Sequence, residues 1–277
     1  MKFRVFSILT AVLMLSAVQA SASQPGADRQ TGQTQQVQQA QQVQQRARNC
    51  IPPVLLPPPL PQLEHRCTPA CPAPNREKLH IVCILDRSGS MQRLTSDTIG
   101  GYNSFIDGQR ADAPQAVVTT VLFDHEYQVL YENMPIKQVR ALTKREYYAR
   151  GTTALLDAVG STILRLDGTF KKNGTCPRSE PAIFMIMTDG LENASREFNR
   201  ADVKKLVSDA QEKYGWQFIF MGANIDSIAE AGSIGISKDS AMDYAPSAEG
   251  VQKAYDRAGA AVKSYRSQGK VGDDWKK

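Results

Sequence analysis

Three short segments of this chain concentrate the oxygen-bearing side chains that could bind a cation. They are Asp86-Arg87-Ser88-Gly89-Ser90, Gly151-Thr152-Thr153 and Thr188-Asp189-Gly190. Two carboxylates and three hydroxyls from these segments would form an all-oxygen ligand set, which suits a hard divalent cation such as Mg²⁺ or Mn²⁺. Gly89 allows its loop to curl tightly enough to bring Ser88 and Ser90 together. The sequence predicts a cation site, provided that the fold brings the three segments to one place.

Short apolar runs precede two of these segments. Leu79 to Leu85 and Ala182 to Met187 are almost continuously apolar, as expected of central parallel strands covered on both faces. Val117 to Phe123 and Gln217 to Met221 are predicted as further strands, and Tyr127 to Tyr131 as an antiparallel edge strand reached by a tight turn.

Segments with helical periodicity alternate with the strands. We expect helices around Leu94 to Ile106, over Ala154 to Leu166 with Gly168 as its stop, over Arg200 to Tyr214, and over Val251 to Tyr265. This alternation predicts a doubly wound α/β fold, with a mostly parallel sheet, one antiparallel edge strand and helices on both faces. Ligands of such folds bind beyond the carboxyl ends of the strands, where the three oxygen-rich segments would meet.

Over roughly residues 78 to 230 the chain resembles the von Willebrand factor type A (vWA) domain family, including its metal-ion-dependent adhesion site. The family pattern is Asp-x-Ser-x-Ser, then a distant Thr and a distant Asp, and it is matched by Asp86, Ser88, Ser90, Thr153 and Asp189. The resemblance implies a Rossmann-like fold and a protein-binding role without enzymatic activity. It also implies that the serines and Thr153 are direct or near-direct ligands, while the two aspartates often hold the ion through water. One coordination position would be left for an Asp or Glu of a partner protein.

Three further residues are predicted to support the ligands. Gly89 and Gly190 lie within the matched segments, and Asp157 lies one turn after Thr153 on the same face of a predicted helix. For Asp157, a helix-stabilising surface acid is an equally good interpretation. Mg²⁺ is the expected ion, with Mn²⁺ or Ca²⁺ as alternatives.

Two other functions use the same segments. A metal-dependent hydrolase or phosphoryl-transfer enzyme could use Asp86 as nucleophile or base and Ser88 as an attacking hydroxyl. The sequence offers it no second acid in an Asp-x-Asp loop, no Gly-x-Ser-x-Gly elbow and no well-placed histidine. A metal-independent interaction scaffold is the other alternative, and the complete ligand set argues against it.

The N-terminus predicts export. Lys2 and Arg4 precede an apolar run from Phe6 to Val18, and small residues follow at positions 20–22. This pattern is typical of a cleaved signal peptide over residues 1–22, although a retained anchor is the alternative. We therefore expect a periplasmic or secreted protein, and no later stretch predicts a transmembrane segment.

The rest of the chain divides by composition into a Gln-rich low-complexity segment (23–48), a Pro- and Cys-rich linker (49–75) and the vWA-like domain with a C-terminal helix (76–277). In an oxidising compartment, Cys50, Cys67, Cys71 and Cys176 are candidates for two disulfides, whose pairing the sequence leaves open. Cys83 lies within an apolar run and is expected to be a buried thiol.

Charge and histidine content exclude other functions. The formal net charge is +5 over 277 residues, and cleavage of the leader with Lys2 and Arg4 would leave +3, too little to argue for nucleic acid as a partner. The three histidines have no metal-binding spacing, which argues against a His-based zinc hydrolase.

Overall fold

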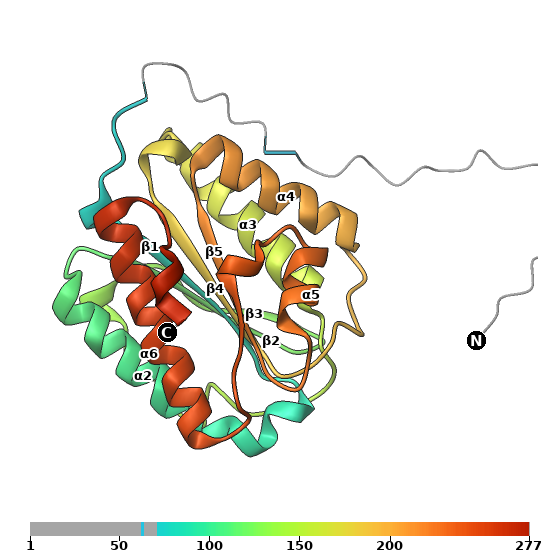
Figure 1. Cartoon of the computed structure of the whole chain (residues 1–277). Coiled ribbons are helices and arrows are strands. Elements are labelled where there is room, and N and C mark those ends of the chain that lie inside the picture. Colours follow the sequence, from blue (N-terminus) through green and yellow to red (C-terminus); the bar gives the residue numbers. More distant parts are fainter. Residues whose placement is uncertain (1–61, 64–70, 277) are drawn as a thin grey trace, which may run out of the picture. The chain divides into compact units, whose positions relative to one another are not determined.

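A six-stranded sheet in the order β3-β2-β1-β4-β5-β6 forms the centre of the domain (Figure 1). This computed structural model describes residues 62, 63 and 71–276, which lie within one unit spanning residues 59–277. The signal peptide, the Gln-rich segment, most of the linker, Cys50 and Cys67 lie outside the described residues. The strands are β1 (His80–Asp86), β2 (Val117–Phe123), β3 (Tyr127–Pro135), β4 (Ala182–Thr188), β5 (Gln217–Gly222) and β6 (Ala241–Asp243).

The sheet is parallel except at one edge. β1 pairs in parallel with β2 and with β4, β4 pairs in parallel with β5, and β5 pairs in parallel with β6. Of these six strands only β3 is antiparallel to its neighbour, β2. The predicted fold class is therefore confirmed, including its antiparallel edge strand.

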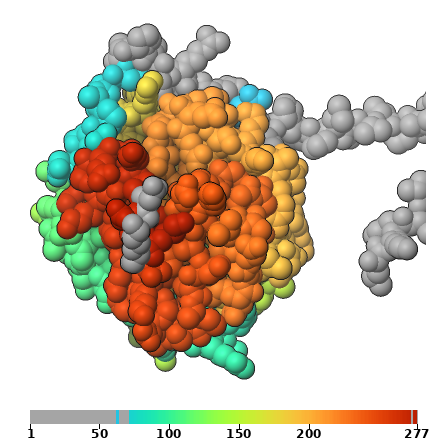
Figure 2. Space-filling model, in the orientation of Figure 1, coloured from blue at the N-terminus to red at the C-terminus, as the bar shows by residue number. Residues whose placement is uncertain are grey.

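Helices cover both faces of the sheet. They are α2 (Thr95–Asp112), α3 (Leu155–Lys172), α4 (Arg200–Tyr214), α5 (Ser227–Ser233) and α6 (Ala248–Gln268). The α2 and α6 helices cover one face, where their apolar side chains pack on Ile81, Cys83 and Leu85. The α3 and α4 helices cover the other face, against Val82 and Ile84. Figure 2 shows that C-terminal segments, coloured red and orange, form much of the surface on the viewed side.

A glycine in α2 has a specific packing role. A Cβ atom on Gly101 would lie 2.2 Å from the buried ring of Tyr255 in α6, so a side chain here would clash with that ring. Gly100, Gly101 and Gly108 weaken the helix propensity of α2, but Gly101 lets α2 and α6 approach closely.

The structure extends α2 beyond the predicted Ile106 to Asp112, corrects the predicted end of α3 and adds the short elements α5 and β6. We expected Gly168 to stop α3, but the helix continues to Lys172 because the next turn buries Phe170 in the core. Asn173 and the positive-φ residue Gly174 end it instead. The α5 helix and β6 were not predicted, since they have only seven and three residues.

Two residues of the predicted linker are fixed to the domain. Leu63 is buried among the residues of the α3 and α4 face, and Lys213 donates a 3.2 Å hydrogen bond to its carbonyl oxygen. Cys71 forms a disulfide with Cys176, one of the pairings that the sequence left open. Cys83 is a free, buried thiol, as predicted. None of the helices in the described part of the chain has both the length and the apolar character needed to cross a membrane.

Candidate metal centre

Four of the five predicted ligands lie at or just after the carboxyl ends of β1 and β4, and Thr153 lies in the segment directly before α3. β1 ends at Asp86, and the 3₁₀ helix η2 (Gly89–Leu94) follows at once. β4 ends at Thr188, directly before Asp189. Since β1 and β4 are neighbouring parallel strands, both aspartates leave the sheet at the same edge.

Asp86 is buried and held from two sides. Its Oδ1 accepts a 2.6 Å hydrogen bond from the backbone N–H of Ser88, and its Oδ2 accepts one of 2.6 Å from the hydroxyl of Thr188. The Thr188 hydroxyl in turn accepts a 3.2 Å bond from the N–H of Gly190. These bonds fix the carboxylate relative to both loops.

The other four predicted ligands lie near Asp86 and one another: Ser88, Ser90, Thr153 and Asp189. The Oγ atoms of Ser88 and Ser90 are 3.0 Å apart, and the Ser90 hydroxyl donates to Oδ1 of Asp189. A Cβ atom on Gly190 would lie 3.4 Å from Oγ1 of Thr153 and 3.5 Å from Oγ of Ser90. Thr153 therefore reaches the same cluster from its separate loop, and Gly190 leaves room for it.

The two carboxylates of this cluster are buried without a cationic partner in the described residues. Asp86 and Asp189 are almost fully buried, and neither forms an ion pair with a cationic side chain of the described residues. Burial raises the pKa of Asp86 to about 6, an effect that the nearby charge of Asp189 increases. Burial also raises the pKa of Asp189, although the Ser90 hydroxyl opposes this. Two buried carboxylates without a counter-ion fit a bound divalent cation, which would stabilise their charged forms.

The segment that carries Thr153 is tied to the segment after Asp189. The N–H of Thr153 donates to Oδ1 of Asn193 at 2.9 Å, and the carbonyl oxygen of Thr153 accepts from the N–H of Asn193 at 3.0 Å. At the start of α3, Glu192 accepts a 2.9 Å bond from the N–H of Leu156, and the Ser195 hydroxyl accepts one of 3.0 Å from the N–H of Asp157. The Asp189 loop thus satisfies two of the free N–H groups of α3, those of Leu156 and Asp157, and fixes the position of Thr153.

Asp157 has defined partners in that loop. Its carboxylate accepts hydrogen bonds of 2.8–2.9 Å from three consecutive backbone N–H groups, those of Arg196, Glu197 and Phe198. The bonds hold the segment between Asp189 and α4 in place. Asp157 is therefore more than a surface acid, and its predicted support of the ligands remains a proposal.

A buried ionic group that the sequence analysis missed fixes the other side of the Thr153 segment. Nε of Arg87 donates to Oδ2 of Asp124 at 2.8 Å, and Nε of Arg150 donates to the same oxygen at 2.8 Å. The N–H of Arg150 also donates to the carbonyl oxygen of Arg87, and the N–H of Ala154 to that of Asp124, both at 2.8 Å. The ring of Tyr148 lies beside both guanidinium groups, 5.5 Å and 5.6 Å from their central carbons.

This ionic group determines the state of Asp124. Burial would raise the pKa of Asp124, but the N–H of Glu126 and the two guanidinium groups outweigh it and lower the pKa. In the sequence, only the position of Arg87 between two predicted ligands pointed to this ionic group. Its partner Asp124 lies 37 positions further along the chain. Two tyrosines were also missed: the Tyr147 hydroxyl donates to the carbonyl oxygen of Asp86, and that of Tyr244 to the carbonyl oxygen of Thr188 at 3.3 Å.

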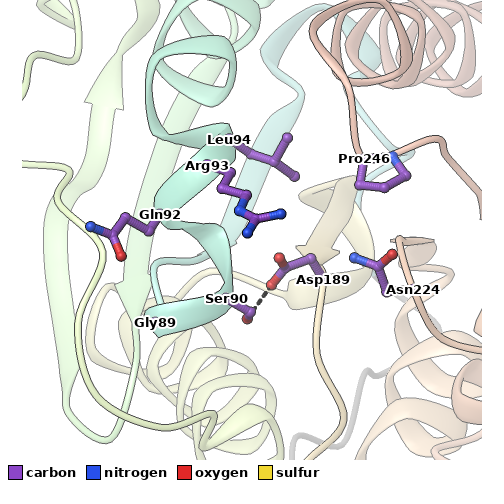
Figure 3. A pocket seen from close by; sticks show the side chains of 8 residues that line it. All are labelled: Gly89, Ser90, Gln92, Arg93, Leu94, Asp189, Asn224 and Pro246. Atoms are coloured by element: carbon purple, nitrogen blue, oxygen red, sulfur yellow. Dashed lines mark hydrogen bonds between the residues drawn. The ribbon is translucent and has the colours of Figure 1, made fainter.

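A pocket of about 420 Å³ opens beside the cluster (Figure 3). Ser90, which is exposed, and Asp189 lie in its wall, so the site is accessible to a partner on this side. No group of three or more His, Cys, Asp or Glu side chains in the described residues is arranged to hold a metal ion. The candidate centre would depend on hydroxyl oxygens as much as on carboxylates.

Comparison with solved structures finds this fold in distant proteins. The von Willebrand factor domain of the type V pilus tip protein Mfa5 from Porphyromonas gingivalis matches with a TM-score of 0.50 and 11% identity, over 71% of this chain and 98% of that chain. Proximal thread matrix protein 1 from the mussel byssus matches with a TM-score of 0.49 and 15% identity, over 67% of this chain. Another structure of the mussel protein, with zinc in its metal-ion-dependent adhesion site, has the same TM-score and identity over 70% of this chain. Both mussel matches cover 48% of the mussel chain, so the present chain spans about half of that protein.

A scan against protein-family models finds no match, and neither does a search of curated proteins. The sheet order, the single antiparallel edge strand and the match to the Mfa5 domain agree with the family resemblance of the sequence. This chain contains a domain of the von Willebrand factor type A fold.

Proposed function

We propose that this domain binds a divalent cation, Mg²⁺ above all, at Asp86, Ser88, Ser90, Thr153 and Asp189, and through it binds an acidic residue of a partner protein. The observation that carries the proposal is the pair of buried carboxylates, without a cationic partner in the described residues, in contact with exposed and buried hydroxyls. Isolated buried charge is costly, so the pair is expected to need a counter-ion.

The mechanism follows from the ligand types. Hydroxyl oxygens are neutral, and two carboxylates only balance a divalent ion. The ion would carry no excess negative charge, so it could still bind a further anionic oxygen at a remaining coordination position. Ser90 faces the pocket, so a partner's Asp or Glu can approach from that side. The bonds from Thr188 and Ser88 hold Asp86 in a fixed position, which reduces the reorganisation needed when the ion binds.

The test is a calorimetric titration of Mg²⁺ and Mn²⁺ into the chelator-treated protein. We expect saturable binding that Asp86→Ala abolishes while the fold is retained, as judged by circular dichroism. Asp167→Asn is the matched control, because Asp167 is an equally buried acid in α3, where it bonds Tyr214 and Lys171. A variant Asp86→Ala that binds the ions as wild type does would contradict the proposal.

The same protein separates the two alternative functions. A metal-independent scaffold predicts partner capture that is equal with and without chelator, whereas the proposed mechanism predicts capture only with metal. A hydrolase or phosphoryl-transfer enzyme predicts metal-dependent turnover of activated ester or phosphate substrates that Ser88→Ala removes. We expect no turnover above that of the Asp86→Ala variant.

We also propose that the domain works outside the cytoplasm, in adhesion, envelope assembly or surface recognition. The Cys71–Cys176 disulfide supports an oxidising compartment, and the signal-peptide pattern of residues 1–22 agrees with it. Cleavage can be checked by N-terminal sequencing of the exported protein. An intact leader on the mature protein would favour the anchor alternative.

A further inference from the structure

The pocket beside the candidate metal centre contains a positive charge that the metal site does not use. Its lining combines Ser90 and Asp189 with Arg93, Asn224 and Pro246 (Figure 3). Arg93 lies in the last turn of η2, whose buried residues are Met91 and Leu94. Burial of those two side chains leaves Arg93 exposed on the pocket side of the turn.

Within the described residues, the guanidinium of Arg93 is unpaired. It makes no hydrogen bond and no ion pair with these residues. The carboxylate of Asp189 lies in the same pocket, but its hydrogen-bond donor there is the hydroxyl of Ser90. Five other arginines of the domain form ion pairs with carboxylates: Arg87, Arg110, Arg150, Arg165 and Arg200. Arg93 therefore presents a planar set of N–H donors, suited to a carboxylate, to the pocket.

A second donor lies in the same lining. Asn224 has a φ of 57°, a conformation that is uncommon for residues other than glycine. Two backbone bonds hold the strand end before it, from Ala223 N–H to the carbonyl oxygen of Thr188 at 3.0 Å and from Tyr244 N–H to that of Gly222 at 2.8 Å. Figure 3 shows Asn224 and Arg93 on either side of Asp189.

The size of the pocket allows more than one ligand group. At about 420 Å³ it falls within the range of roughly 300–1,000 Å³ that is typical of small-molecule sites, and a carboxylate on the cation would fill only part of it. When a cation balances Asp86 and Asp189 and holds a partner's first carboxylate, the guanidinium of Arg93 is still available in the lining. It could bind a second carboxylate directly through its N–H donors.

We propose that Arg93 selects partners in which the metal-binding Asp or Glu has a second acidic side chain close to it in sequence or in space. This inference rests on the proposed function, because the first acid binds the cation. Arg93 is a specificity residue of the pocket and takes no part in holding the metal.

Fluorescence polarisation with labelled peptides in a neutral Ala-Gly-Ser host tests the proposal. The peptides carry one Glu, two Glu separated by zero to three residues, or one Glu and one Lys, and each is measured with Mg²⁺ and with chelator. For the wild-type protein we expect the best two-acid peptide to bind about fivefold to tenfold more tightly than the one-acid peptide, as one hydrogen bond of typical net strength would give. In Arg93→Gln this ratio should fall to about one to two, and Arg93→Glu should favour the Glu–Lys peptide.

Arg196→Gln is the matched control, because Arg196 is exposed in the segment after Asp189 but does not line this pocket. It should keep the wild-type ratio. Titration of Arg93→Gln with Mn²⁺ alone distinguishes a specificity role from a structural one. If Arg93 only selects partners, loss of its positive charge near the cation should leave the Mn²⁺ affinity unchanged or raise it up to roughly threefold. If Arg93 holds the site together, the Mn²⁺ affinity of the variant should fall.

The outcomes are distinguishable. Equal, chelator-sensitive binding of one-acid and two-acid peptides would overturn the role of Arg93 and leave the proposed function intact. An equal loss of preference in Arg196→Gln would overturn it as well, because general surface charge would then explain the effect. Saturable Mn²⁺ binding without chelator-sensitive binding of any peptide would contradict both the inference and the capture of an acidic partner.

Discussion

The two edges of the parallel sheet are built from different chemistry. At the carboxyl ends of the strands, here called the cation edge, the buried groups include Asp86, Arg87, Asp124 and Asp189. At the amino ends, here called the disulfide edge, Trp216 packs on Phe170, Phe184 and Tyr214, with ring centroids 5.0–6.0 Å apart. The Cys71–Cys176 disulfide closes this edge.

The difference separates stability from function. Aromatic packing and a disulfide contribute directly to stability, whereas a buried ionic group is weak evidence for it because desolvation opposes the charge attraction. The cation edge nevertheless contains the Arg87–Asp124–Arg150 group directly behind the Thr153 segment. We interpret this group as holding the site in position, and the disulfide edge as supplying the stability that permits it.

The largest expected effect is at the cation edge. Asp124→Asn removes the charge that compensates the buried Arg87 and should destabilise the protein by about 3–5 kcal/mol in urea unfolding. Divalent-ion affinity should fall with it, since the Thr153 segment loses one of its attachments. Glu126→Gln is the control, because Glu126 is an exposed partner of Arg150 and should change stability by less than about 1 kcal/mol.

The pH dependence of the stability difference between wild type and Asp124→Asn tests whether the charge of Asp124 causes it. The pKa of Asp124 is lowered in the folded protein, so its ionised form contributes stability above its usual pKa of 3.8, and this contribution is lost as the pH falls through the lowered value. The stability gap between wild type and Asp124→Asn should therefore be constant above about pH 5 and shrink in acid. A gap that is independent of pH would mean that packing, and not charge, explains the effect.

The next effect belongs to the disulfide edge. Replacing Cys71 and Cys176 together by serine opens a loop of 105 residues and should lower the free energy of unfolding by about 2–4 kcal/mol. Mg²⁺ affinity measured well below the unfolding temperature should stay at the wild-type value. A loss of affinity in this double variant would show that the two edges are coupled and would break the comparison.

The cation edge was easier to predict from sequence than the groups behind it. Asp86 ends one apolar strand and Asp189 directly follows another, so local pattern together with the rule for strand ends predicts the position of both. Nothing local pairs Arg87 with Asp124, because that contact depends on the register of β1 with β2. Long-range contacts of this kind are set by packing and leave no periodic signal.

Element ends show the same limit. Gly215 ended α4 as predicted, in a left-handed conformation, whereas Gly168 did not end α3. A glycine stops a helix only where the next turn has nothing to bury, and Phe170 packs against His80 and Trp216 at the disulfide edge. Sequence identifies the candidate stop, and tertiary packing decides whether it acts.

Two glycines of α3 sharpen the comparison within one helix. Gly160 lies nearer the cation edge, and a Cβ atom there would be 2.7 Å from the ring of Phe198. Because the backbone of Phe198 is held by Asp157, the ring has little freedom to move away. Gly160→Ala should cost about 1–3 kcal/mol in unfolding free energy through overpacking. An unchanged midpoint in urea would mean that the loop adapts freely and that Asp157 does not fix it.

Gly168 provides the smallest effect, of opposite sign. It lies in the same helix nearer the disulfide edge, is exposed, and would have nothing within 4 Å of an added Cβ atom. Gly168→Ala should therefore stabilise the protein by about 0.5–1 kcal/mol, since alanine loses less backbone entropy in a helix. Thermal unfolding measures the gain, and Mn²⁺ affinity should not change. A loss of stability would contradict the open space and the ordinary helical backbone that the structure gives Gly168.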